Sequence, residues 1–277
     1  GDNRDLHSFP TRRSSDLHLH IKGLRVQPDL WHGADFTLFH NHSAGTVVFE
    51  DIRAKTGPRH YRNGVAAEGR DLFIENVEWA YNDAFPQDNV VFTRQRVWAR
   101  NLNVEMNITP DPVKIKTAGG GALTFSRFST HRKIVNDGGT LWSFGQKVGE
   151  YNGPFFENRD GGRTELLSVF INQANDPAAF PPVPAAACVM MRGPGGEMSL
   201  VGQERPRGPR NAPHANTMAR IEATAGWRSV PVTRFPTYLV YGGFDPFGDS
   251  DPERYFEQNT FRVFGLFRCR GERSAAE

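Results

Sequence analysis

The chain has 277 residues, of which 38% are hydrophobic and 23% are charged, an ordinary composition for a globular domain. Its 33 Lys and Arg residues nearly balance 31 Asp and Glu residues, so the net charge of +2 predicts no strong attraction to nucleic acid or to an anionic membrane. No apolar run reaches the roughly 18 residues that a membrane span requires. The two cysteines, Cys188 and Cys269, lack metal-ligand spacing, and they are compatible with two thiols or with one disulfide.

The start of the chain differs from the rest. Residues 7–17 (HSFPTRRSSDL) resemble the in-frame translation of a common sequencing adapter. We therefore expect residues 1–17 to be a non-native leader and exclude them from fold reasoning, as for a cloning scar. Such a leader predicts that the true N-terminus, any signal peptide and some upstream coils are missing. A basic, Ser-rich linker is the alternative interpretation.

Short alternating apolar runs follow from residue 18 onward. Few windows show a helical period, and clusters of Gly, Asn or Asp separate most runs, as in chains that alternate strands and turns. Strands are predicted at residues 34–40, 46–52, 71–81, 89–93, 96–105, 113–117, 122–128, 141–148, 154–158, 164–172, 188–191, 197–202, 218–224, 230–233 and 236–241. After residue 242 the pattern fades, with a short helix predicted at 249–258 and a last strand or cap at 259–268.

An Asp-Gly-Gly turn occurs twice, beginning at Asp137 and at Asp160, and each time an alternating apolar run follows. Elsewhere Phe49-Glu50-Asp51-Ile52 recurs 25 residues later as Ile74-Glu75-Asn76-Val77. A unit of this length cannot bury its own apolar face and must stack on its neighbours. The aspartates at the two turns are explained by Asx turn chemistry rather than by ligand binding.

This period predicts an all-β fold, a single-stranded right-handed parallel β-helix (solenoid), with three short strands in each turn of the coil. We expect the β-helix to cover residues 18–240 and residues 241–277 to form an irregular C-terminal cap or tail. A β-sandwich is the structural alternative, because strands every 8–12 residues also fit that fold.

Three segments point to a family. Residues 96–103 (RVWARNLN), 136–147 (NDGGTLWSFGQK) and 160–167 (DGGRTELL) resemble bacterial right-handed β-helix proteins of the pectate-lyase superfamily. The resemblance is strongest over residues 90–175 and concerns turns and core strands. It implies a glycoside-hydrolase-like or lyase-like activity on a polysaccharide, and hence a secreted or periplasmic protein. Residues 149–154 and Ser168 depart from the usual pattern of the family.

A cluster of carboxylates and aromatic rings at residues 78–88 is the best local candidate for an active site. Glycosidases need two carboxylates roughly 5–10 Å apart, and aromatic faces suit sugar stacking. We predict Glu78, Asp83 and Asp88 as catalytic residues, with Trp79 and Tyr81 binding substrate. The alternative is a strand followed by an Asx-rich turn, with both aromatic rings filling one face.

Two further groups are candidates for substrate binding. Arg94 and Arg96 can bind an anionic sugar or serve a lyase mechanism, although alternating arginines on a strand are usually solvated. His40 and His42 are two residues apart, so a strand places both on one face, where they can flank a substrate or chelate a metal. No third ligand follows at a reliable spacing, so we predict no metal site and consider surface histidines the alternative.

The predicted function is cleavage of a polysaccharide or oligosaccharide by a carboxylate pair in the groove of the helix, as in a glycoside hydrolase. The alternatives are a pectate-lyase-type elimination and a non-catalytic structural or adhesive β-helix of the tail-spike kind. No cofactor is expected, and a divalent cation such as Ca²⁺ is expected only for the lyase. Two converging carboxylates in an aromatic-lined groove favour the enzyme, and a polar ladder without a cleft favours the structural role.

Overall fold

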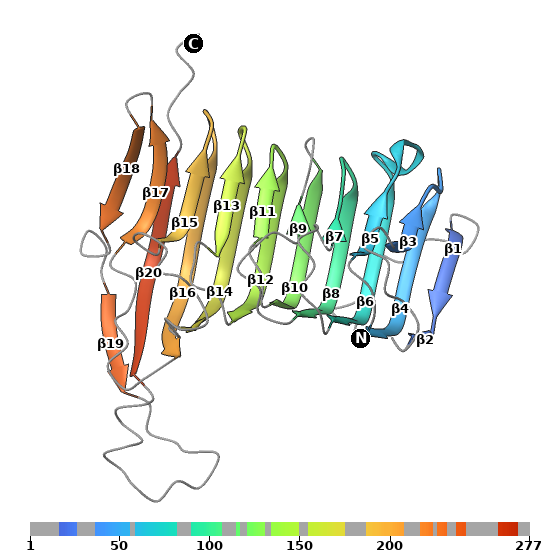
Figure 1. Ribbon diagram of the computed structural model, residues 1–277, viewed down its shortest axis with the longest axis horizontal. Helices are drawn as coiled ribbons and strands as arrows, with labels where there is room; N and C mark the ends of the chain where they lie inside the picture. Colours follow the sequence, from blue (N-terminus) through green and yellow to red (C-terminus); the bar gives the residue numbers. More distant parts are fainter. Residues whose placement is uncertain are drawn as a thin grey trace, which may run out of the picture.

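The computed structural model of the protein describes residues 17–26, 37–55, 59–81, 90–106, 115–116, 121–130, 134–149, 155–174, 187–207, 217–223, 226–231, 237–241 and 260–270. These residues form two long sheets whose strands lie side by side along one axis (Figure 1). The chain passes from one sheet to the other and back, and each strand pairs with the equivalent strand of the next coil. The described residues are therefore an all-β parallel solenoid, as the repeat period predicts.

The 11-stranded sheet contains the long strands of the coils. In spatial order it runs β1 (Leu17–Lys22), β4 (Thr46–Lys55), β6 (Asp71–Tyr81), β8 (Arg96–Met106), β10 (Ala122–Thr130), β12 (Thr140–Gly149), β14 (Arg163–Ala174), β16 (Glu197–Arg207), β20 (Thr260–Arg270) and β19 (Thr237–Tyr241), with β2 (Arg25–Val26) also paired to β4. Pairing is parallel from β1 to β16, and β20 then joins β16 in antiparallel orientation.

The 9-stranded sheet contains the shorter strands. Its order is β18 (Gly226–Pro231), β17 (Thr217–Ala223), β15 (Ala187–Arg192), β13 (Phe156–Arg159), β11 (Ile134–Asp137), β9 (Ile115–Lys116), β7 (Val90–Val91), β5 (Arg59–Asn63) and β3 (Thr37–Asn41). All pairs are parallel except β17 with β18. A single-turn 3₁₀ helix, η2 (Val65–Ala67), follows β5.

The core lies between the two sheets and consists of stacked rows of side chains. Parallel pairing in register places each inward residue directly on its equivalent in the next coil. One row of the long sheet contains Val47, Leu72, Val97, Leu123, Leu141, Thr164 and Met198, and another contains Phe49, Ile74, Ala99, Phe125, Ser143, Leu166 and Leu200. All of these residues are buried, and each large apolar one contributes about 1.5–3 kcal/mol of transfer free energy.

A single residue of positive φ divides most of the long strands. Asp51, Asn76, Asn101, Arg127, Gly145 and Ser168 occupy this position on successive strands from β4 to β14. The alternation of buried and exposed residues shifts by one residue across this position, so the residue before it and the residue itself both face outward. Such a residue bends a strand, in the manner of a β-bulge. Each coil thus has three straight segments but two strands, which explains why three short strands are predicted from the sequence.

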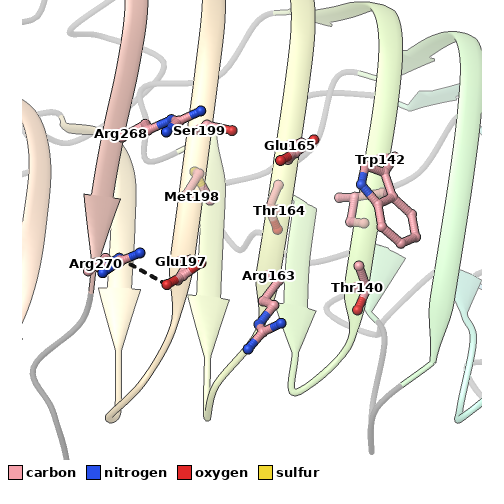
Figure 2. Close-up of a pocket in the computed structure, with 11 residues that line it drawn as sticks. Thr140, Trp142, Arg163, Thr164, Glu165, Glu197, Met198, Ser199, Arg268 and Arg270 are labelled. Carbon is pink, nitrogen blue, oxygen red and sulfur yellow. Dashed lines mark ion pairs between the residues drawn. The ribbon is translucent and has the colours of Figure 1, made fainter.

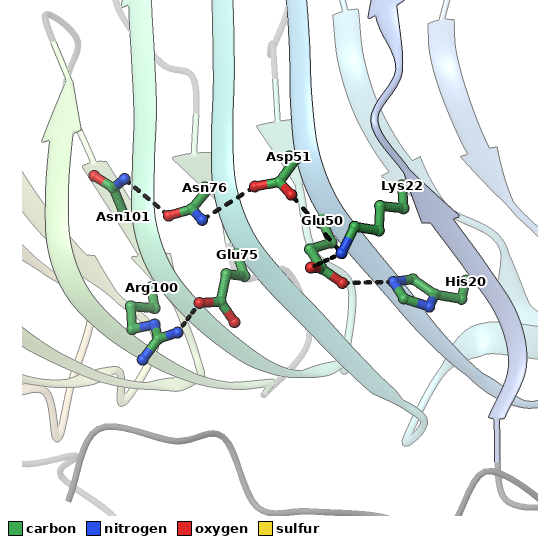
Figure 3. A network of polar contacts seen from close by, with 8 residues as sticks. All are labelled: His20, Lys22, Glu50, Asp51, Glu75, Asn76, Arg100 and Asn101. Atoms are coloured by element: carbon green, nitrogen blue, oxygen red, sulfur yellow. Dashed lines mark hydrogen bonds and ion pairs between the residues drawn. The ribbon is translucent and has the colours of Figure 1, made fainter. Parts of the chain in front are cut away.

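Asparagine suits this bend because its short polar side chain tolerates the left-handed region and can bond locally. Asn76 Nδ2 donates to Asp51 Oδ1 at 3.1 Å, and Asn101 Nδ2 donates to Asn76 Oδ1 at 3.0 Å (Figure 3). Beside this ladder, Lys22 pairs with Glu50 across neighbouring strands. The three amide and carboxylate groups tie consecutive coils together on their outer surface.

Buried asparagines hold the opposite corner, where the short sheet leads into the long one. Asn136 and Asn158, in the residues just before the glycine pairs, are 1% and 0% exposed. Asn136 Nδ2 donates to the carbonyl of Arg163 at 2.9 Å, and Asn158 Nδ2 donates to the carbonyl of Glu197 at 2.7 Å. Each asparagine therefore fixes the first residue of the long strand in the following coil. The repeated Asp-Gly-Gly turn is this corner, as predicted.

Several predictions about the fold have clear outcomes. Parallel pairing of equivalent strands excludes the β-sandwich, which is antiparallel. The right-handed sense of the coil and the domain limits at residues 18–240 remain predictions. The leader at residues 1–16 and the helix at 249–258 lie outside the described residues. Beyond residue 240, β20 is a long regular strand that covers the edge of β16.

Candidate functional site

The outer face of the long sheet carries rows of side chains that cross the strands. One row contains Phe73, Trp98, Thr124, Trp142, Glu165 and Ser199, and it continues onto β20 as Arg268. The rings of Phe73 and Trp98 stack with centroids 5.0 Å apart. A parallel row contains Asp71, Arg96, Ala122, Thr140, Arg163 and Glu197, and it ends on β20 as Arg270.

A pocket of about 450 Å³ opens where these two rows reach the C-terminal end of the sheet (Figure 2). Strands β12, β14, β16 and β20 supply its residues. Trp142 forms one side, with 38% of its surface exposed, and Arg268 lies on the opposite side. Glu165, Glu197 and Arg163 lie between them. The pocket thus combines an exposed indole with two carboxylates and several guanidinium groups.

The two glutamates of the pocket have different environments. Glu197 forms an ion pair with Arg270, and its Oε1 atom lies 2.9 Å from Arg270 Nε. Among the described residues, no hydrogen bond or ion pair engages the carboxyl group of Glu165, which is exposed. One carboxylate of the pocket is therefore paired with an arginine, while the other is available to a ligand.

Register determines the spacing of this pair. Glu165 lies opposite Ser199, so Glu197 is its diagonal neighbour, one strand across and two residues along. With strands about 4.8 Å apart and a rise of about 3.3 Å per residue, the two Cα atoms are about 8 Å apart. Both side chains point away from the core on the same face (Figure 2). Two glutamate side chains on one face at this Cα separation can both reach a ligand that lies between them.

Apolar side chains extend this surface along the strands. Phe144 and Leu167 are directly opposite each other on β12 and β14, and they are 45% and 40% exposed. Phe144 lies two residues beyond Trp142, so both rings point outward from β12. The pocket is therefore the polar end of a partly apolar face rather than an isolated hollow.

Glu78, predicted as catalytic, lies in a different place. It points outward from β6 beyond the bend, and its Oε2 pairs with Arg53 Nε at 2.8 Å. Asp83 and Asp88 lie outside the described residues, so their part in a carboxylate pair remains a prediction. Glu78 is separated from the pocket by two intervening long strands, β8 and β10.

Trp79, predicted beside Glu78 as a substrate-binding residue, does not line the pocket. Trp79 is 0% exposed and packs in the core, with its ring 6.2 Å from that of Tyr61 and nearly parallel to it. In this position the indole has no exposed face to offer to a sugar. Tyr81 ends β6, and its side chain lies outside the described part of the structure.

The predicted arginines make ion pairs on the protein's own surface. Arg96 Nε lies 2.7 Å from Asp71 Oδ1, and the Asp71 side chain is 1% exposed. Arg94 lies in the turn before β8 with a φ of 48°, and it pairs with Glu68 at 3.5 Å. Arg96 belongs to the same row as Arg163 and Glu197, but it lies four coils away from Glu197. Neither arginine lines the pocket.

His40 and His42 lie next to each other at the end of β3, with ring centroids 3.9 Å apart. They are far from the pocket, because β3 is the last strand of the short sheet at its N-terminal end. In the described part of the chain, no group of three or more His, Cys, Asp or Glu residues could hold a metal ion. Likewise, none of its helices is long and apolar enough to cross a membrane.

The sequence reasoning missed Trp142, Glu165 and Glu197. The three residues lie far apart between positions 142 and 197, so no local cluster marks them. One signal was available: Trp142 and Glu165 are equivalent positions of consecutive repeats, five residues after Asp137 and Asp160. In a solenoid, residues one period apart become neighbours.

No protein-family model, no curated protein and no solved structure matches this chain. The geometry of the fold and of the pocket therefore carries the functional argument.

Proposed function

We propose that the protein binds a polysaccharide on the outer face of its long sheet and hydrolyses it in the pocket between Trp142 and Arg268. The observation that carries this proposal is the convergence of an exposed tryptophan and two glutamates in one pocket of about 450 Å³. Indole faces stack on the apolar faces of sugar rings, and glycosidases use a pair of carboxylates that flank the bond to be cleaved. The resemblance of residues 96–167 to β-helix proteins of the pectate-lyase superfamily supports the same conclusion.

A polymer fits the surface better than a single sugar. Trp98 and Trp142 belong to one row and are separated by the strand that carries Thr124, so they are about 10 Å apart. Sugars stacked along this row run across the strands, parallel to the axis of the solenoid. Beyond Trp98 the row reaches Phe73, which is only 6% exposed and stacks on the Trp98 ring. Trp98 and Trp142 thus offer two successive contacts to a chain whose cleavage site is at Glu165.

The chemistry assigns different roles to the two glutamates. Glu165, which no described residue engages, donates its proton to the glycosidic oxygen as the bond to the anomeric carbon breaks. Glu197, paired with Arg270, accepts a proton from a water molecule, and the resulting hydroxide bonds to the anomeric carbon. One water is consumed, and one new reducing end is formed. Trp142 binds and orients the sugar and takes no part in proton transfer.

Single substitutions test this assignment on a panel of polysaccharides, with new reducing ends as the readout. Glu165→Gln and Glu197→Gln are each expected to lower the rate by at least about 100-fold, the usual size of a general acid–base contribution. Glu78→Gln, which alters the predicted carboxylate outside the pocket, is expected to leave the rate unchanged. Loss of activity in Glu78→Gln together with full activity in both pocket variants would move the active site to residues 78–88.

Binding is tested separately. Trp142→Ala is expected to weaken retention on the polysaccharide substrate, measured by affinity electrophoresis. Trp227→Ala is the matched control, because Trp227 is similarly exposed, at 36%, but belongs to the other sheet. Equal retention of the two variants would contradict the proposed binding face.

The arginines of the pocket favour a second candidate, a lyase acting on an anionic polysaccharide. Arg163, Arg268 and Arg270 surround the carboxylates, and a lyase uses such groups to neutralise a uronate and to remove the adjacent proton. An elimination leaves an unsaturated product that absorbs in the ultraviolet, and hydrolysis does not. Binding of polysaccharide without either product would instead support the structural or adhesive alternative. A polysaccharide substrate also places the protein in the periplasm or outside the cell, as part of this proposal.

A further inference from the structure

Two imidazole rings meet at the end of β3, on a surface that the proposed function does not use. His40 and His42 are both exposed, and the residue between them, Asn41, is buried. Alternation along the backbone therefore directs both rings to the same side. His42 Nε2 and His40 Nδ1 are 3.2 Å apart.

The backbone beneath the rings is held by buried hydrogen bonds. Asn41 Nδ2 donates to the Tyr61 hydroxyl at 3.1 Å, and Asn41 Oδ1 accepts from the Ser43 amide at 2.9 Å. The Asn41 carbonyl accepts from the Gly64 amide at 2.9 Å. These contacts fix the residue that separates the two histidines, so the rings are brought together by the fold rather than by a ligand.

Glycine at position 64 leaves the space that the His42 ring fills. A Cβ atom placed on Gly64 would lie 2.7 Å from His42 Nδ1, closer than real Cβ atoms come to a neighbour. The ring therefore rests on bare backbone, with Nδ1 on this side and Nε2 directed towards His40. The orientation of His42 is thus defined by packing as well as by the hydrogen bonds of Asn41.

Arg62, opposite His40 on β5, contacts the same ring nitrogen of His40 that faces His42. Its Nη2 lies 3.3 Å from His40 Nδ1. A guanidinium group has only donors, so Nδ1 presents a lone pair to it. The same lone pair faces His42 Nε2. An unprotonated ring nitrogen, directed at a second imidazole, is the form in which histidine ligates a metal.

We propose that His40 and His42 form a two-histidine site for a divalent transition metal, through His40 Nδ1 and His42 Nε2. Metal–nitrogen bonds of about 2.0–2.1 Å place two ligands about 3.3 Å apart on a tetrahedral ion and about 2.9 Å apart at a right angle. The observed 3.2 Å lies between these values. Water completes the coordination, and Cu²⁺ is expected to bind more tightly than Ni²⁺ or Zn²⁺.

The positive charge of Arg62 disfavours metal binding, since its guanidinium group faces His40 Nδ1, the nitrogen that would ligate the ion. The side chain is exposed and can turn into solvent when the metal binds. Its removal is therefore expected to strengthen binding, whereas removal of either histidine weakens it. This opposite response separates a metal site from a general loss of structure.

Titration calorimetry of the full chain with CuCl₂, NiCl₂ and ZnCl₂ in a non-coordinating buffer tests the proposal. We expect His40→Gln and His42→Gln each to lower Cu²⁺ affinity at least 10-fold, and Arg62→Ala to raise it. Far-UV circular dichroism checks that each variant is folded. No metal binding by the native protein, or equal affinity in both histidine variants and the native protein, would overturn the site. Binding that is lost in the histidine variants but unaffected by Arg62→Ala would place the ion away from Nδ1 and also refute this geometry.

Discussion

Asn76 offers a sharp test of how the coils are bent. It lies at the bend of β6 with a φ of 52°, and its amide joins Asp51 on one side and Asn101 on the other. Two substitutions separate these roles. Asn76→Gly keeps a residue that accepts positive φ but deletes the amide. Asn76→Ala deletes the amide and also places a Cβ in the left-handed region.

The expected magnitudes follow from these losses. Two exposed side-chain hydrogen bonds contribute about 1 kcal/mol together, at the lower end of the usual range. Glycine adds about 0.5 kcal/mol through the greater freedom of the unfolded chain. Alanine instead adds about 1–2 kcal/mol for its left-handed backbone. We therefore expect Asn76→Gly to cost about 1.5 kcal/mol and Asn76→Ala about 2.5 kcal/mol.

Equilibrium urea denaturation, followed by far-UV circular dichroism, measures both free energies of unfolding. Because coils of a solenoid unfold as coupled neighbours, the midpoint and the slope are compared in each variant. An Asn76→Ala variant as stable as Asn76→Gly would show that the left-handed bend is not a constraint at this position. A variant as stable as the native chain would refute the ladder as a source of stability.

Three further predictions concern packing, charge and stereochemistry. Gly202→Ala should destabilise the protein by more than about 2 kcal/mol in the same denaturation assay, because the added Cβ would lie 2.2 Å from the carbonyl oxygen of Val169. Gly145→Ala, where the Cβ meets open space at a φ of 68°, should cost only about 1–2 kcal/mol. The hydrogen bond from Lys22 lowers the pKa of Glu50 in the folded protein. The stabilisation that ionised Glu50 gives the fold is therefore present above the ordinary Glu pKa and is lost as the pH falls through the folded-state pKa. Carboxyl chemical shifts of Glu50, followed against pH in the native and Lys22→Ala proteins, measure the pKa shift. Hydrolysis should invert the anomeric centre, as shown by proton NMR of the first product, because Glu197 in the proposed mechanism activates a water rather than bonding to the sugar.

Each of these expectations has a contrary result. Equal costs at the two glycine positions would mean that close approach of neighbouring coils does not limit the side chain. An unchanged carboxyl titration after loss of Lys22 would remove the proposed cause of the pKa shift. Retention of the anomeric configuration would refute the role of Glu197 as the base that activates a water.

Much of the fold was predictable because local sequence patterns indicate it. Alternating apolar runs predicted the strands, and the recurrence of Asp51 as Asn76, 25 residues later, predicted the repeat period of the coils. The bend was not predictable in detail, because a strand that shifts its alternation by one residue resembles two short strands. The buried corner asparagines were also missed: the aspartates beside them, Asp137 and Asp160, fit a turn equally well.

The site was less accessible to sequence reasoning for a physical reason. Residues 78–88 attract attention because acids and aromatic rings are adjacent in sequence, yet adjacent residues of a strand point to opposite faces. Trp79 accordingly lies in the core while Glu78 lies outside it. The pocket instead combines residues of four strands, which become neighbours through the register of the sheet and the antiparallel pairing of β20.

The most direct test of the central claim is a crystal structure of the Glu165→Gln variant with an oligosaccharide of its substrate. The account predicts a sugar ring stacked on Trp142, with the glycosidic oxygen at position 165 and the anomeric carbon facing Glu197, and further rings crossing the strands towards Trp98. An oligosaccharide bound elsewhere on the solenoid, with the pocket empty, would contradict the account.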